Sequence, residues 1–162
     1  MAEMNRRDLC LAAGAFAAGG LMAEAQDPKA QDAKTHGPNA GDTIEMTKSR
    51  VFHFDQLKVD QHANGGWGRQ VMHGTLPTGE FVEVHETGLP PGQMPHPPHK
   101  HRNTEFVLIR EGHVEYWGDD GKREPMGPGD IAYSASNQMH GMKNTGSTMA
   151  TYFIVSISHG QL

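Results

Sequence analysis

The sequence predicts a small all-β domain, and three observations support this prediction. From Val51 onward, short segments of alternating apolar and polar residues are separated by glycine and proline, a pattern typical of a sandwich or barrel of short strands. No segment has a sustained helical period. The chain that follows an N-terminal targeting segment is long enough for one domain with a proper core, but not for two.

The N-terminus has the features of an export signal. Arg6 and Arg7 precede a mildly apolar stretch, Leu9–Met22, which is too short and too rich in Ala and Gly to span a membrane stably. Ala23–Ala25 then offers the small-x-small pattern that a signal peptidase cleaves. We predict that residues 1–25 are a signal peptide resembling a twin-arginine signal, with ordinary secretion and a cytoplasmic N-terminal helix as alternatives. The expected location is periplasmic or secreted.

The next segment is expected to be a flexible leader. Residues 26–46 contain glycines, prolines and many polar residues, and almost no apolar ones. The single cysteine, Cys10, leaves with the signal, so a metal site in the mature chain must use nitrogen and oxygen ligands. The chain is mildly acidic and has no basic run, which argues against nucleic acid as a partner. Nothing after Met22 could anchor it in a bilayer.

We expect the domain, residues 47–162, to be built from nine short strands. Each segment has alternating apolar residues and is bounded by glycine, proline or other turn-forming residues. Leu76–Gly79 and Gly118–Gly121 have the sequences of hairpin turns. The expected strands, in order, are Arg50–Phe54, Arg69–Thr75, Glu80–Thr87, Glu105–Glu111, His113–Gly118, Lys122–Met126, Asp130–Ser134, Met139–Asn144 and Thr148–Ile157.

The two-residue period of a strand assigns side chains to faces. If Glu105 faces inward, Val107 and Ile109 do so too, while Phe106 and Leu108 face outward. Outward Phe and Leu need cover, and a C-terminal strand that is apolar on both faces adds to the surface to be hidden. We therefore expect a homodimer.

Inward residues of the later strands follow the same rule. His140, Met142 and Asn144 should share one face, which would place Met142 beside any metal held by His140. Asn144 could reach a substrate, but a cap on a turn is the more ordinary role for it.

The residues most informative about function lie in the segment HKHRNTE. His99 and His101 are two apart, so on a strand both imidazoles point to one face. Glu105 follows at the start of an apolar run. Imidazole and carboxylate are the ligands that a divalent metal takes when positions must stay open for substrate. A surface-exposed, histidine-rich turn is the alternative interpretation, but it does not explain why Glu105 opens an apolar strand.

These residues resemble a known family. The spacing H-x-H-x3-E-x6-G, here His99, His101, Glu105 and Gly112, is similar to the first motif of the cupin superfamily. The segment from Gly129-Asp130 through His140 to Asn144 resembles the second motif, with Ala135 and Asn137 where the family usually has Pro and Gly. The resemblance implies a double-stranded antiparallel β-barrel of jelly-roll type, with His99, His101, Glu105 and His140 as ligands.

Such a site would hold one divalent metal ion, and the ligand set is compatible with Fe, Mn, Ni, Cu or Zn. The resemblance implies a metal-dependent oxygenase or isomerase acting on a small oxygenated molecule, with Glu105 as ligand and candidate catalytic base. A non-catalytic metal or small-ligand binder of the cell envelope is the alternative. Further polar candidates near the site are Tyr116, Tyr133, Gln138 and His96, with His96 expected at the rim. His85 and His113 are expected to make only surface or cross-strand contacts.

Overall fold

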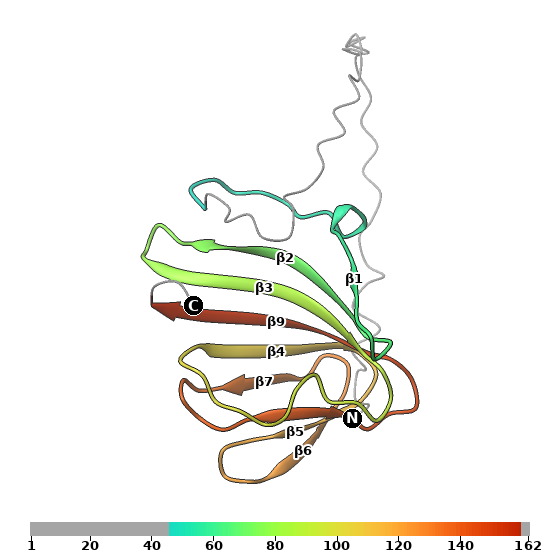
Figure 1. The fold of residues 1–162 in the computed structure, drawn as a ribbon. Helices are drawn as coiled ribbons and strands as arrows, with labels where there is room; N and C mark the ends of the chain where they lie inside the picture. Colours follow the sequence, from blue (N-terminus) through green and yellow to red (C-terminus); the bar gives the residue numbers. More distant parts are fainter. Residues whose placement is uncertain (1–45, 160–162) are drawn as a thin grey trace, which may run out of the picture. The chain divides into compact units, whose positions relative to one another are not determined.

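The computed structural model describes residues 46–159, and within them the chain is almost entirely β (Figure 1). The predicted signal peptide and nearly all of the predicted leader lie outside the described residues. Among residues 46–159, no helix is long and apolar enough to cross a membrane. The strands are β1 (Asp60–Gln61), β2 (Trp67–Thr75), β3 (Glu80–Leu89), β4 (Thr104–Glu111), β5 (Val114–Trp117), β6 (Arg123–Met126), β7 (Ile131–Ser134), β8 (Gly141–Asn144) and β9 (Ala150–His159).

The strands form two antiparallel sheets, which confirms the predicted fold class. The larger sheet has the order β1-β2-β3-β9-β4-β7, and the smaller has the order β6-β5-β8. Figure 1 shows the C-terminal strand β9 lying between β3 and β4, far from both in sequence. Gly79 and Gly121 adopt positive φ angles of 104° and 74° in the two predicted turns, a conformation that glycine adopts without steric cost.

One predicted strand is wrong. Arg50–Phe54 forms no strand; the segment instead ends in a short 3₁₀-helix, η2 (Phe54–Gln56). Arg69 holds this turn, because its Nη1 donates to the Phe54 carbonyl at 2.8 Å and its guanidinium lies 3.5 Å from the Phe54 ring centroid. Next to it, Arg110 Nη1 lies 2.7 Å from an oxygen of Glu86, whose side chain is fully buried. Phe54 therefore packs against Arg69 of β2 and Arg110 of β4 rather than pairing in a sheet.

Apolar side chains from both sheets form the core. Val107 and Ile109 face inward on β4 and are 4 % and 3 % exposed, as the strand period predicts. Met142 also points into the core, and burying a side chain of this size contributes about 1.5–3 kcal/mol. The buried cluster consists of Leu89, Val107, Ile109, Val114, Met126, Ala132, Met142, Ala150 and Tyr152.

Candidate metal centre

Three histidines from two parts of the chain converge between the sheets. His99 and His101 lie in the segment that leads into β4, and His140 immediately precedes β8. Their ring centroids are 4.8–5.0 Å apart pairwise. One ring nitrogen from each lies within 4.8 Å of the other two, close enough for all three to hold one metal ion.

Backbone hydrogen bonds bring the two segments together. The N–H of His99 donates to the carbonyl of His140 at 3.0 Å, and the N–H of His140 donates back to His99 at 2.9 Å. The N–H of Asn137 donates to the His101 carbonyl at 2.7 Å. Asn137 has a φ of 58°, a left-handed conformation that Asn tolerates better than most residues. Asn137 therefore makes the turn before His140, at the position where the motif that this segment resembles usually has Gly.

Backbone carbonyls orient the imidazoles. His101 Nδ1 lies 3.2 Å from the Asn103 carbonyl, and His140 Nδ1 lies 3.0 Å from the Gln138 carbonyl. Because a carbonyl oxygen only accepts, each Nδ1 carries the hydrogen, and the lone pair of the neutral ring is on Nε2. Both Nε2 atoms, and His99 Nδ1, are buried without a hydrogen-bond partner among the described residues. Buried ring nitrogens with free lone pairs fit a metal centre, and in His101 and His140 a carbonyl on the opposite ring nitrogen fixes the ring.

Glu105 borders the three histidines. Its two oxygens lie 3.3 Å from His101 Nε2 and 3.6 Å from His140 Nε2. Burial raises the pKa of the Glu105 carboxyl, but the contact with His140 and the charge of His101 outweigh it and leave that pKa below its ordinary value. This ionised carboxylate lies within 3.6 Å of two of the imidazoles, where it could supply the fourth donor that the resemblance implies. The four predicted ligands lie together, and their assignment as ligands stays a prediction.

The electrostatics of the histidines depend on this carboxylate. The contact with Glu105 raises the pKa of His140, against the opposing effect of burial. Burial, assisted by the neighbouring His96 and His140, lowers the pKa of His99. A neutral His99 is ready to ligate, whereas a metal ion would have to displace the proton favoured at His140.

The other polar candidates occupy different places. His96 lies at the exposed rim, with its ring centroid 4.0 Å from that of His99. The Tyr116 hydroxyl and the Ser134 hydroxyl are 2.6 Å apart next to the site. Tyr133 is 59 % exposed on the outer face, and Gln138 contributes its backbone carbonyl to His140.

A polar row that the sequence analysis missed crosses the inner face of the large sheet. Cross-strand pairing places Glu105 between Ser156 and Ser134, and places Glu83 between Ser156 and His73. His85 follows Glu83 on the same face of β3, and its Nδ1 lies 3.3 Å from Glu83 Oε1. The signal in the sequence was the pair Glu83-x-His85, whose two-residue spacing puts both side chains on one face.

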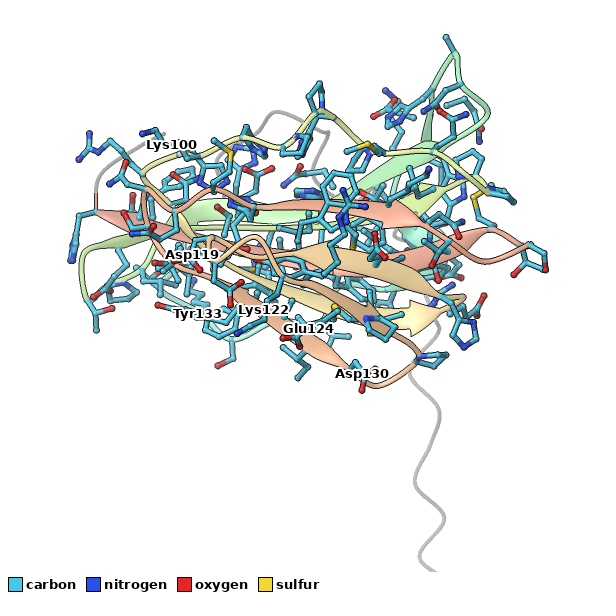
Figure 2. The ribbon with its side chains drawn as sticks, turned by 90° about the horizontal axis from the view of Figure 1, so that it is seen from below. Lys100, Asp119, Lys122, Glu124, Asp130 and Tyr133 are labelled. Atoms are coloured by element: carbon cyan, nitrogen blue, oxygen red, sulfur yellow. The ribbon has the colours of Figure 1, made fainter. Side chains whose placement is uncertain are left out.

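Two adjoining pockets, of about 220 Å³ and about 530 Å³, share Tyr116 and Tyr133. The smaller pocket also touches His140 and Ser134. Polar and charged residues line much of the larger pocket, and Figure 2 shows Asp119, Tyr133, Lys122, Glu124 and Asp130 in one band. Such a charged lining suits water and small polar molecules rather than an apolar ligand.

The fold and the site together define a small antiparallel barrel with a histidine-rich centre of the kind that binds a metal. Residues 85–156 match the family model described as Cupin domain. This match covers less than half of the chain, and solved structures named as cupins have the same fold.

Three solved structures illustrate the likeness of fold. An RmlC-like cupin from Shewanella frigidimarina is 18% identical with a TM-score of 0.56, over 70% of this chain and 94% of that chain. A predicted oxalate decarboxylase from Thermotoga maritima is 24% identical with a TM-score of 0.54, over 67% of this chain and 98% of that chain. A sugar phosphate isomerase of the cupin superfamily from Silicibacter pomeroyi is 19% identical with a TM-score of 0.55, over 70% of this chain and 83% of that chain. No curated protein matches the chain significantly in sequence.

Proposed function

We propose that this protein is a metal-dependent enzyme that acts on a small oxygenated molecule by an isomerase-type or oxygenase-type reaction. The observation that supports it best is the convergence of three buried imidazole nitrogens without partners beside the Glu105 carboxylate. Two proteins of similar fold are named as a predicted oxalate decarboxylase and a sugar phosphate isomerase. Bound there, a divalent metal (Fe, Mn, Ni, Cu or Zn) would act as a Lewis acid toward two substrate oxygens.

The protein's own residues would orient the substrate and move its protons. Val107, Ile109 and Met142 are buried in the core, and we expect them to form the apolar wall of the substrate pocket. Glu105 has two candidate roles, as a permanent ligand or as a base that leaves the metal when substrate arrives. Glu105→Gln separates them, because the amide can ligate weakly but cannot accept the proton. Retention of metal with loss of turnover identifies Glu105 as the base.

The metal content of purified variants tests the centre. His101→Ala and His140→Ala should each lower metal occupancy sharply, because each removes a buried donor nitrogen. His113→Ala is the matched control, since His113 is exposed between β4 and β5. Equal loss from all three variants would mean that the histidines bind metal diffusely rather than as one centre.

A non-catalytic binder of metal or a small ligand in the cell envelope is the alternative function. Oxygen consumption and product formation by the protein loaded with each metal, across catechols, diketones, hydroxyketones and flavonols, separate the two. Tight binding without turnover of any of them in any metal form favours the binder.

We also propose a homodimer formed through the outer face of the large sheet. Pairing across β9, β4 and β7 aligns Val155, Phe106 and Tyr133, with the Phe106 and Tyr133 ring centroids 5.4 Å apart. The adjacent Ile131 is 62 % exposed, which leaves a continuous apolar surface to be covered. Light scattering should give the mass of a dimer at micromolar concentration and that of a monomer for Ile131→Lys; a monomeric wild type would refute the proposal.

Export by the twin-arginine route, to a periplasmic or secreted location, is a further proposal supported by Arg6-Arg7 and the Ala-x-Ala pattern before Gln26. Replacing both arginines by lysine should leave the precursor in the cytoplasm. Undiminished export of this variant would indicate the general secretion route instead.

A further inference from the structure

The inner face of the large sheet carries a carboxylate–histidine pair close to the proposed metal centre. His85 Nδ1 lies 3.3 Å from Glu83 Oε1, and the two side chains are 28% and 29% exposed. The contact with His85 lowers the pKa of Glu83 most strongly, against the opposing effect of burial, so the carboxylate is ionised at neutral pH. His85 Nδ1 is buried and its contact with Glu83 does not have the geometry of a hydrogen bond, but only a hydrogen on Nδ1 gives it a favourable interaction with this carboxylate, and that tautomer leaves the lone pair on Nε2.

The register of the strands places this pair beside Glu105. Glu83 and Glu105 both pair with Ser156, one from each side, so all three lie at the same level of the same face. With adjacent strands about 4.8 Å apart, the Cα atoms of Glu83 and Glu105 are roughly 10 Å apart, a distance that a molecule of three to six carbons can span.

We infer that His85, oriented by Glu83, is the residue that moves a carbon-bound proton of a hydroxycarbonyl substrate whose two oxygens lie at the proposed metal centre. This inference rests on the proposed function and narrows it to an isomerase-type reaction. His85 would be the catalytic residue, and Glu83 the positioning residue that fixes its tautomer. In this inference Glu105 keeps the role of a ligand, and the His85–Glu83 pair supplies the acid–base group.

The proton balance of such a step is closed within the site. His85 Nε2 takes the proton from the carbon that bears the hydroxyl, the C–H electron pair forms the carbon–carbon double bond, and the carbonyl π pair moves to the carbonyl oxygen to give an enediolate. The imidazolium then returns the proton to the neighbouring carbon, while the hydroxyl proton passes to the former carbonyl oxygen. The electrons move only within the substrate, so the step needs no oxidant or reductant.

Binding of a stable two-oxygen ligand tests, without turnover, whether His85 lies beside a molecule bound at the proposed metal centre. Glycolohydroxamate, titrated by calorimetry into the Zn²⁺-loaded protein, should bind about tenfold more weakly to His85→Gln, the value of roughly one hydrogen bond. His113→Gln is the control and should bind like the wild type, with the metal content measured in all three proteins. A wild type that holds no metal overturns the proposed function. Equal metal content with unchanged hydroxamate affinity in His85→Gln overturns only the role of His85.

Solvent deuterium incorporation into dihydroxyacetone tests the chemistry. The Mn²⁺-loaded wild type should exchange the proton on the carbon beside the carbonyl, and His85→Ala should do so at least tenfold more slowly, with added imidazole restoring part of the rate. Glu83→Gln should lower kcat with little change in KM, because it disturbs the tautomer of His85 rather than binding. Absence of exchange in the metal-loaded wild type, or exchange in His85→Ala at the wild-type rate, overturns the inference.

Discussion

Asn144 offers the sharpest test of how the barrel is held together. Its side chain is fully buried, and Nδ2 donates to the carbonyls of Leu89 at 2.7 Å and Thr148 at 2.8 Å. Oδ1 accepts from the N–H of Gly146 at 2.9 Å. One amide thus joins the end of β3 to the turn between β8 and β9, which identifies Asn144 as a cap on that turn.

Asn144→Ala removes all three hydrogen bonds and leaves the Leu89 carbonyl without its amide donor in a buried place. At about 1 kcal/mol for each hydrogen bond, we expect the free energy of unfolding to fall by about 3 kcal/mol. For a domain of this size that corresponds to a fall in Tm of roughly 12 °C. Urea unfolding followed by circular dichroism measures the change, provided that the m-value is unaltered.

Asn64→Ala is the matched control, because the Asn64 side chain makes a single hydrogen bond, from the N–H of Gly66 at 3.0 Å, in an exposed turn. This variant should lower the free energy of unfolding by only about 0.5–1 kcal/mol. Metal content should be unchanged in both variants. If Asn144→Ala is no less stable than Asn64→Ala but binds hydroxamate more weakly, Asn144 contacts the ligand and the capping argument is wrong.

Three further predictions follow from other parts of the structure. Gly112 has a φ of 80°, and a Cβ there would lie 2.7 Å from Ala150 Cα. Gly112→Ala should therefore lower the free energy of unfolding, measured in urea, by more than about 2 kcal/mol. Gly79→Ala, where a Cβ would meet open space, should lower it by only about 1 kcal/mol. The pKa of Glu83 is lower in the fold than in the unfolded chain, so the stability from its ionisation is present above the unfolded pKa and is lost as pH falls through the folded one. Glu83→Gln should therefore show a shallower loss of stability than the wild type as the pH falls from about 5 to 3, and parallel curves would contradict this. Zn²⁺ at about a thousand times its Kd should raise the free energy of unfolding of the wild type by roughly 4 kcal/mol, as measured by thermal unfolding. The same Zn²⁺ should raise that of His140→Ala much less, and equal increases in the two proteins would refute the assigned centre.

Several features of the fold could be predicted because they depend on local rules. The two-residue period correctly assigned Val107 and Ile109 to the inside and Phe106 to the outside. Glycine and proline marked the turns correctly, because few other residues adopt their backbone conformations. The same period failed at Arg50–Phe54, where the apolar ring of Phe54 packs on Arg69 from another segment.

The sequence by itself determined the all-β class, the position of most strands and the spacing of His99, His101 and Glu105, since each depends on alternation along one segment. Only the tertiary structure decided which nitrogens of His101 and His140 are free, that Asn144 is a cap, and that Glu83 and His85 lie at the level of Glu105. The physical reason is that β9, at the end of the chain, pairs between β3 and β4. The relative register of β3 and β4 is set by hydrogen bonds to this distant strand, and no pattern within either segment encodes it.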